Sequence, residues 1–279
     1  MQPVGPAGEA LVDCAARYPD RRLSTLVDNP SSLQSLKIAA RQQPEARLGV
    51  YLDVNNGMNR TGIAPGPDAL TLYRALSQSQ NLDLRGLHIY DGHIRDRDIS
   101  ERTDHANRDF GNAEKLIRDI AAVGLEIPNL VVGGSPSFPT HTERKVDLSP
   151  GTTLLWDFGY GEAFSDLPFD YAAALFTRVV SKPSPGLLCF DLGHKAVASE
   201  MEPPRVRILG IEDASFVSHS EEHLVIATDN ADRFSVGDSF YAIPKHICPT
   251  VALHNKAAVI RDGKVEGYWE IAARDRILD

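Results

Sequence analysis

The sequence has few cysteines, and no two of them lie close together. Cys14, Cys189 and Cys248 are an odd number with wide spacing, which argues against a disulfide framework. Disulfides form mainly in secreted proteins, so this content indicates a reducing compartment. The first residues also lack the basic and apolar regions of a secretory signal peptide. We therefore expect a cytoplasmic protein.

Long apolar runs and an excess of basic charge are also lacking. No run approaches the roughly 18 apolar residues that span a bilayer, so we expect no membrane partner. Lys and Arg number 29 against 38 Asp and Glu, a net charge of -9. This balance argues against nucleic-acid binding, which needs a basic surface. With 42% hydrophobic residues among 279, the chain has the composition of a globular protein with a buried core.

Apolar runs alternate with helix-like stretches over the first 170 residues. Strict alternation of strands and helices implies a parallel sheet with crossover helices. Asn29 and Pro30 mark the start of one helix, as its cap and first residue. Ligands of such sheets bind at the carboxyl ends of the strands. The runs at 23–28, 48–54, 84–90, 129–133 and 151–157 predict strands, and the stretches at 30–40, 67–76 and 104–123 predict helices.

Beyond about residue 171, β-rich segments follow one another without helices. Asp262 and Gly263, flanked by two such segments, predict a hairpin. We therefore predict an α/β fold in which a β/α barrel-type domain at 1–170 precedes an antiparallel β domain at 171–279. A complete (β/α)8 barrel has roughly eight strands, whereas only about five strand–helix units precede the β domain. Either the sheet is open, or the TIM-type barrel is incomplete at its N-terminal side.

Two predicted strand ends offer groups that can hold a ligand or act on it. The loop at 53–62 places Arg60 among Asn and Gly residues, where a guanidinium and backbone N–H groups can bind an anion or a ring nitrogen. A turn with an incidental arginine is an equal alternative. The next strand end combines a phenol, a carboxylate and an imidazole at 90–93. Tyr90 and His93 are therefore candidate catalytic residues, since such groups orient and exchange protons.

A third strand end is rich in glycine. Gly133 and Gly134 allow the backbone to approach a ligand closely, and Ser135 adds a hydroxyl group, so that N–H and O–H donors can hold a phosphate. Gly-Gly-Ser also occurs in many linkers. Its place late in the strand order, where a barrel has its phosphate site, favours the phosphate.

His246 and Cys248 are two residues apart in a segment that we expect to be extended. Alternate side chains of a strand point to the same side. An imidazole nitrogen and a thiolate can then reach one zinc ion, with the remaining positions open to water or substrate. The alternative is a buried cysteine beside an incidental histidine, because zinc sites normally have three or more protein ligands.

Together and in this order, these segments resemble the D-threonine aldolase and D-serine dehydratase family. Its members are pyridoxal-phosphate enzymes of fold type III, with an alanine-racemase-like barrel and a β domain. The resemblance covers essentially the whole chain. It rests on the segments at 53–62, 90–93, 133–136, 148–152, 191–196, 220–223 and 244–250.

The resemblance implies a role for each cofactor-binding candidate. Arg60 would face the pyridine nitrogen of pyridoxal 5'-phosphate and keep it unprotonated. Tyr90 and His93 would lie beside the cofactor and the substrate. The phosphate would be held by Gly133, Gly134 and Ser135.

The resemblance also implies a metal and a reaction. His246 and Cys248 would bind a divalent ion, zinc first and manganese or magnesium as alternatives, that polarises the substrate's β-hydroxyl group. We expect a lyase that cleaves a D-β-hydroxy-α-amino acid to glycine and an aldehyde, as D-threonine aldolase does. A D-serine dehydratase, releasing pyruvate and ammonia, and a non-catalytic cofactor-binding homologue are the alternatives. The His-x-Cys pair resembles the dehydratase site, whereas 90–93 and 191–196 resemble aldolase-like members. Related enzymes pair, so we expect a homodimer.

One departure from the family concerns the cofactor's covalent anchor. The Schiff-base lysine of the family precedes every segment seen here, and Met1 aligns with the middle of the family's barrel. We therefore expect that the chain lacks this lysine and the first barrel units, and that it is inactive as it stands. A truncated gene model, a pseudoenzyme fragment or a separately encoded N-terminal piece would each produce this pattern.

Overall fold

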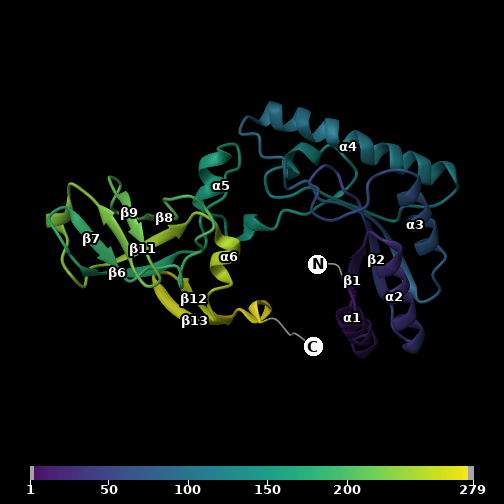
Figure 1. The fold of residues 1–279 in the computed structure, drawn as a ribbon, viewed down its shortest axis with the longest axis horizontal. Coiled ribbons are helices and arrows are strands. Elements are labelled where there is room, and N and C mark those ends of the chain that lie inside the picture. The colour runs from purple at the N-terminus through teal and green to yellow at the C-terminus, as the bar shows by residue number, and fades with distance from the viewer. Residues whose placement is uncertain (1–2, 276–279) are drawn as a thin grey trace. The chain divides into compact units, whose positions relative to one another are not determined.

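The computed structural model describes residues 3–275. They form two compact units, one extending to Gly151 and the other beginning at Thr152 (Figure 1). Among these residues, none of the helices combines the length and the apolar character needed to cross a membrane.

The first unit contains a five-stranded sheet in which the strands follow the order of the chain. Each neighbouring pair is parallel, which confirms the predicted parallel sheet. The carboxyl ends of the strands therefore meet at one edge. The strands are β1 (Ser24–Val27), β2 (Leu48–Asp53), β3 (Leu82–Ile89), β4 (Leu130–Val132) and β5 (Asp147–Leu148).

Amphipathic helices pack on this sheet and bury their apolar faces with it. Asn29 accepts a hydrogen bond from the Ser32 N–H group at the start of its helix, and Pro30 follows the cap, as predicted. The longest helix begins five residues before the predicted 104, because the Asp98 carboxylate accepts hydrogen bonds from the first turn. The helices are α1 (Pro6–Arg17), α2 (Pro30–Gln42), α3 (Pro67–Ser77), α4 (Ile99–Ala122) and the 3-10 turn η1 (Phe138–His141).

The strand predicted at 151–157 does not form. The segment turns through η2 (Thr152–Leu154) and enters α5 (Phe158–Ala163), and Trp156 has a positive φ of 53°. Asp157 fixes this path, because its carboxylate caps α5 and also accepts the Ile247 N–H group. Since these contacts tie the segment to the second unit, the division falls at Gly151–Thr152, earlier along the chain than the predicted boundary at 170–171.

The second unit is built on a six-stranded antiparallel sheet in the order β8-β11-β6-β7-β10-β9, which confirms the predicted antiparallel domain. Its core includes Leu188, Phe190 and Ile226. The predicted hairpin forms at Asp262 and Gly263, which both have positive φ. The elements are β6 (Leu175–Ser181), β7 (Leu187–Phe190), β8 (Val206–Ile208), β9 (Ser215–His219), β10 (Leu224–Ala227), η3 (Ala231–Arg233), β11 (Ser239–Pro244), α6 (Ile247–Val251), β12 (Lys256–Arg261), β13 (Lys264–Glu270) and η4 (Ala272–Arg274).

The two tryptophans of the second unit have opposite environments. Trp156 is buried and stacks on Tyr160, with ring centroids 5.3 Å apart. Trp269 lies on β13 and is 69% exposed.

Candidate functional site

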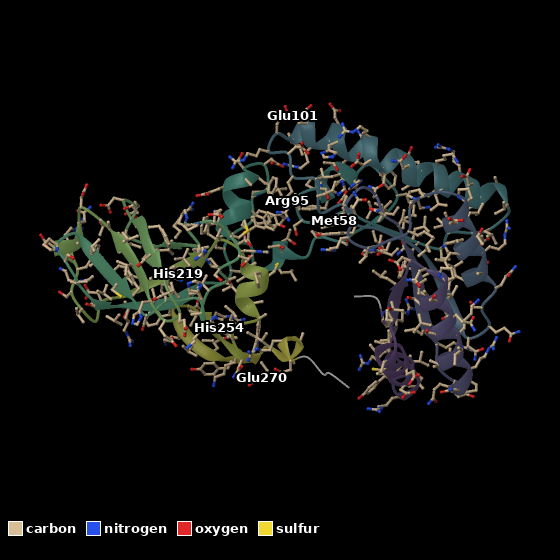
Figure 2. All side chains as sticks on the ribbon, in the orientation of Figure 1. Met58, Arg95, Glu101, His219, His254 and Glu270 are labelled. Carbon is tan, nitrogen blue, oxygen red and sulfur yellow. The ribbon has the colours of Figure 1, made fainter. Side chains whose placement is uncertain are left out.

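Three predicted cofactor-binding residues meet at the carboxyl edge of the parallel sheet. Arg60 follows β2, Tyr90 follows β3 and Gly134 follows β4. The Arg60 guanidinium carbon lies 4.8 Å from the centroid of the Tyr90 ring. A Cβ atom on Gly134 would lie 3.0 Å from Cε2 of the same ring. A small hollow beside them is lined in part by Arg60, Tyr90 and Met58, the last of which is labelled in Figure 2.

Gly134 is held by a buried network that extends from the strand end to η1. Its N–H group donates to Ser137 Oγ at 2.9 Å, and the Ser137 hydroxyl donates to Asp91. The second oxygen of Asp91 lies 2.7 Å from His141 Nε2. Asp91, Ser137 and His141 are fully buried. The Gly133 N–H group is bonded as well, to the Ile89 carbonyl at 3.1 Å, so the N–H groups of both glycines already have partners within the chain.

The residues at this edge fit a phosphorylated aromatic cofactor. Gly133 has a φ of 91°, a conformation that favours glycine, and the space beside Gly134 would be narrowed by any side chain. Asn56, in the loop after β2, is buried, and neither polar atom of its side chain has a hydrogen-bond partner within residues 3–275. Buried amides are rarely unpartnered, so this loop has capacity for a polar ligand or a water molecule.

His93 lies in a different group of side chains from Tyr90. Its Nε2 is 2.8 Å from Asp109 Oδ2, and His105 Nε2 is 3.4 Å from the same oxygen. His105 Nδ1 is 2.7 Å from Asp96 Oδ2. Burial favours the neutral form of Asp96, but the hydrogen bond from His105 and nearby positive charge outweigh it and lower the pKa of this carboxyl. The structure thus joins His93 to α4, and its predicted catalytic role stays a prediction.

His246 and Cys248 meet, but in a conformation that differs from the predicted one. His246 is the N-cap of α6 and Cys248 lies in the first turn of that helix, so the expectation of an extended segment is wrong. The helix starts here because the Asp157 carboxylate accepts the Ile247 N–H group at 2.9 Å, and the Thr250 hydroxyl donates to the His246 carbonyl at 2.7 Å.

The side chains of this pair are electrostatically coupled. A hydrogen bond with Cys248 raises the pKa of His246 to about 9, and the same bond lowers the pKa of the Cys248 thiol. Glu200 Oε1 lies 2.6 Å from His246 Nδ1 and orients the ring, as carboxylates do beside metal-bound histidines. The donor set of one imidazole and one thiolate fits zinc. Glu200 was not predicted, because it lies far from the pair in the sequence.

Comparison with known proteins places the chain among alanine-racemase-like proteins. The family model described as alanine racemase, N-terminal domain, matches residues 6–155, and the putative serine dehydratase domain matches 172–260. The chain is 29% identical to D-threonine aldolase of Arthrobacter sp over 277 residues, covering 97% of this chain and 72% of the relative. It is 25% identical to 3-hydroxy-D-aspartate aldolase of Paracoccus denitrificans over 280 residues, covering 96% and 71%.

Solved structures give the same result for the fold. The crystal structure of D-threonine aldolase from Filomicrobium marinum matches with a TM-score of 0.89 at 27% identity, covering 98% of this chain and 75% of that one. D-threo-3-hydroxyaspartate dehydratase from Delftia sp. HT23 matches in fold with a TM-score of 0.76 at 19% identity, covering 94% and 76%. The resemblance and the fold class stated from the sequence are thereby confirmed.

Proposed function

The chain belongs to the family of alanine racemase N-terminal domains, and on this premise we propose that it is a lyase of D-β-hydroxy-α-amino acids of the D-threonine aldolase type, dependent on pyridoxal phosphate and a divalent metal. The observation that carries the proposal is the meeting of Arg60 and Gly134 on the Tyr90 ring at the carboxyl edge of the parallel sheet. The relatives of the chain include aldolases of D-hydroxyamino acids, which supports the proposal.

The residues at this edge would hold the cofactor. Arg60 would present a permanent positive charge to the pyridine ring, and Tyr90 would supply a flat face and a hydroxyl group. Ser135 would hold the phosphate, and Gly133 and Gly134 would let it approach closely, because the N–H groups of both glycines are bonded within the chain. When bound, pyridoxal phosphate draws electrons from the bond that breaks at the substrate's α-carbon.

The metal would be held in the second unit by His246 and Cys248, with Glu200 orienting the histidine. A divalent metal, zinc in the first place, polarises the β-hydroxyl group of the substrate when bound. The lowered pKa of Cys248 supports this role, because the thiolate is the form that binds metals.

A second candidate is dehydration of a D-hydroxyamino acid with release of ammonia. The observation that favours it is the cysteine of the His-x-Cys pair, since this pair resembles the dehydratase site. A non-catalytic homologue that binds the cofactor reversibly is the third candidate. It follows from the prediction that the chain lacks the Schiff-base lysine.

The test combines cofactor binding with product analysis on the full 279-residue chain. Pyridoxal phosphate is titrated by absorbance in the wild type and in Arg60→Ala, with Arg108→Ala, an exposed arginine of α4, as the matched control. We expect weaker binding in Arg60→Ala alone. Equal binding by all three proteins, or no binding by the wild type, would overturn the cofactor assignment.

Product analysis separates the candidates. With zinc present, glycine and acetaldehyde from D-threonine support the aldolase, and pyruvate and ammonia from D-serine support the dehydratase. Cofactor binding without either product supports the non-catalytic homologue. Borohydride reduction followed by intact mass tests for a covalent link to a lysine of this chain, which we expect to be absent. Light scattering tests the proposed homodimer.

A further inference from the structure

His93, His105 and Asp109 direct three donor atoms at one point of the first unit. Each residue offers one donor atom, an imidazole nitrogen or a carboxylate oxygen, and these atoms all lie within 4.8 Å of one another. His93 belongs to the loop after β3, while His105 and Asp109 are one turn apart on α4. Each side chain is about a quarter exposed or less, so an ion from solvent can reach the group.

The distances are close to those of a metal site. Zinc bonds of about 2.0–2.1 Å in a tetrahedron place donor atoms roughly 3.3 Å apart. Asp109 Oδ2 lies 2.8 Å from His93 Nε2 and 3.4 Å from His105 Nε2. An ion would replace the proton shared by His93 and Asp109, and a shift of a few tenths of an ångström would give zinc-like spacing.

A carboxylate behind His105 completes the arrangement. His105 Nδ1 is 2.7 Å from Asp96 Oδ2, so this interaction leaves Nε2, the nitrogen nearer Asp109, as the ligand atom. Metal-bound histidines nearly always have such a partner on their other nitrogen, which fixes the tautomer and the ring orientation. Nδ1 of His93 is buried and lacks a partner within residues 3–275, so Nε2 is the atom through which that ring is held.

Gly57, in the loop after β2, packs closely against two of the donor atoms. A Cβ atom at this position would lie 2.8 Å from His93 Nε2 and 3.0 Å from Asp109 Oδ2. A larger residue at this position would therefore displace the two donor atoms, and glycine lets them keep their spacing. Two imidazoles and one carboxylate form a donor set typical of zinc and of other divalent transition metals, which commonly take a water molecule as a further ligand.

From this geometry we propose that His93, His105 and Asp109 form a metal site for a divalent transition metal such as zinc, separate from the His246 and Cys248 pair. The site joins the loop after β3 to the first half of α4, close in sequence to Tyr90. It goes beyond the proposed function, since it can bind metal whether or not the chain is a lyase.

The test measures zinc content and cobalt spectra of the full-length chain after metal loading and dialysis. The background is a His246→Ala, Cys248→Ser variant, which removes the other pair. In that background we expect about one zinc ion per chain, and cobalt should give visible ligand-field bands without a thiolate charge-transfer band. Adding His105→Asn, or separately Asp109→Asn, should remove both the bound zinc and these bands.

The matched control is His88→Asn in the same background. His88 Nδ1 lies 2.8 Å from Asp53 Oδ1, a His–Asp pair outside the cluster of three, so the loss of His88 should leave the zinc content unchanged. Far-UV circular dichroism shows which variants are folded. Zinc-free protein in the background variant, or unchanged zinc content in folded His105→Asn, would overturn the proposal and leave His93 to its predicted proton-transfer role.

Discussion

Replacing Asp91 with alanine is expected to destabilise the first unit by about 3–5 kcal/mol, as the loss of one partner of a buried pair does. The carboxylate bonds to Ser137 and to His141 Nε2, and all three residues are fully buried. The substitution leaves two buried polar groups unpartnered, each at a cost of about 1–3 kcal/mol, and the resulting total of about 2–6 kcal/mol includes the first range. Asp91→Asn keeps an acceptor for the Ser137 hydroxyl and should therefore lose less stability than Asp91→Ala.

The assay is urea unfolding followed by far-UV circular dichroism, with Asp104→Ala as the control. Asp104 is an exposed residue of α4, so its replacement should change the free energy of unfolding by no more than about 0.5 kcal/mol. Because Ser137 also accepts the Gly134 N–H group, Asp91→Ala should in addition weaken pyridoxal phosphate binding. A free energy of unfolding within about 1 kcal/mol of wild type would refute the reasoning.

Three further predictions have defined outcomes, the first with its own control variant. Gly134→Ala should weaken pyridoxal phosphate binding by about 1 kcal/mol, roughly fivefold in Kd, because its Cβ would press on the Tyr90 ring at 3.0 Å. Gly151→Ala, whose Cβ would meet no described atom within 4 Å, should leave the titration unchanged. Gly111 lies in α4, and its Cβ would likewise meet no described atom within 4 Å. Gly111→Ala should raise the free energy of unfolding, measured in urea, by about 0.5–1 kcal/mol. A free energy of unfolding below that of the wild type would contradict the open space at this position. Burial lowers the pKa of His219, and the positive charges of Arg205 and His194 lower it further. As the pH falls, the unfolded state therefore binds a proton at this histidine before the folded state does. The wild type should lose stability below about pH 6.5 for this reason. His219, labelled in Figure 2, is replaced by glutamine to test this. The Tm of His219→Gln should change less with pH than that of the wild type between about pH 8 and 5. An equal change of Tm in both proteins would contradict the prediction.

Much of the fold was predictable because its signals are local. The alternation of apolar runs and helical stretches predicted β1 to β4, and the Asn29 cap with Pro30 predicted the start of α2. The failure at 151–157 has a non-local cause. Asp157 caps α5 and also binds the N–H group of Ile247, a contact between residues far apart in the sequence that an apolar run does not encode.

The site was predictable where a strand end determines it. Arg60, Tyr90 and Gly134 follow parallel strands, whose carboxyl ends share one edge, so their meeting follows from topology. His141, by contrast, pairs with Asp91 across 50 positions, and no motif marked it. His246 and Cys248 are adjacent because a helix begins at the histidine, although the sequence suggested a strand.

The placement of the two tryptophans determines which part of the protein a fluorescence experiment observes. Both belong to the second unit, so selective excitation of indole gives no direct signal from the parallel sheet. Trp156, stacked and buried, should emit at shorter wavelength and resist acrylamide quenching, whereas the exposed Trp269 should emit at longer wavelength and be quenched readily. An unfolding curve recorded by indole emission would therefore miss the loss caused by Asp91→Ala if the two units unfold independently, while circular dichroism would register it.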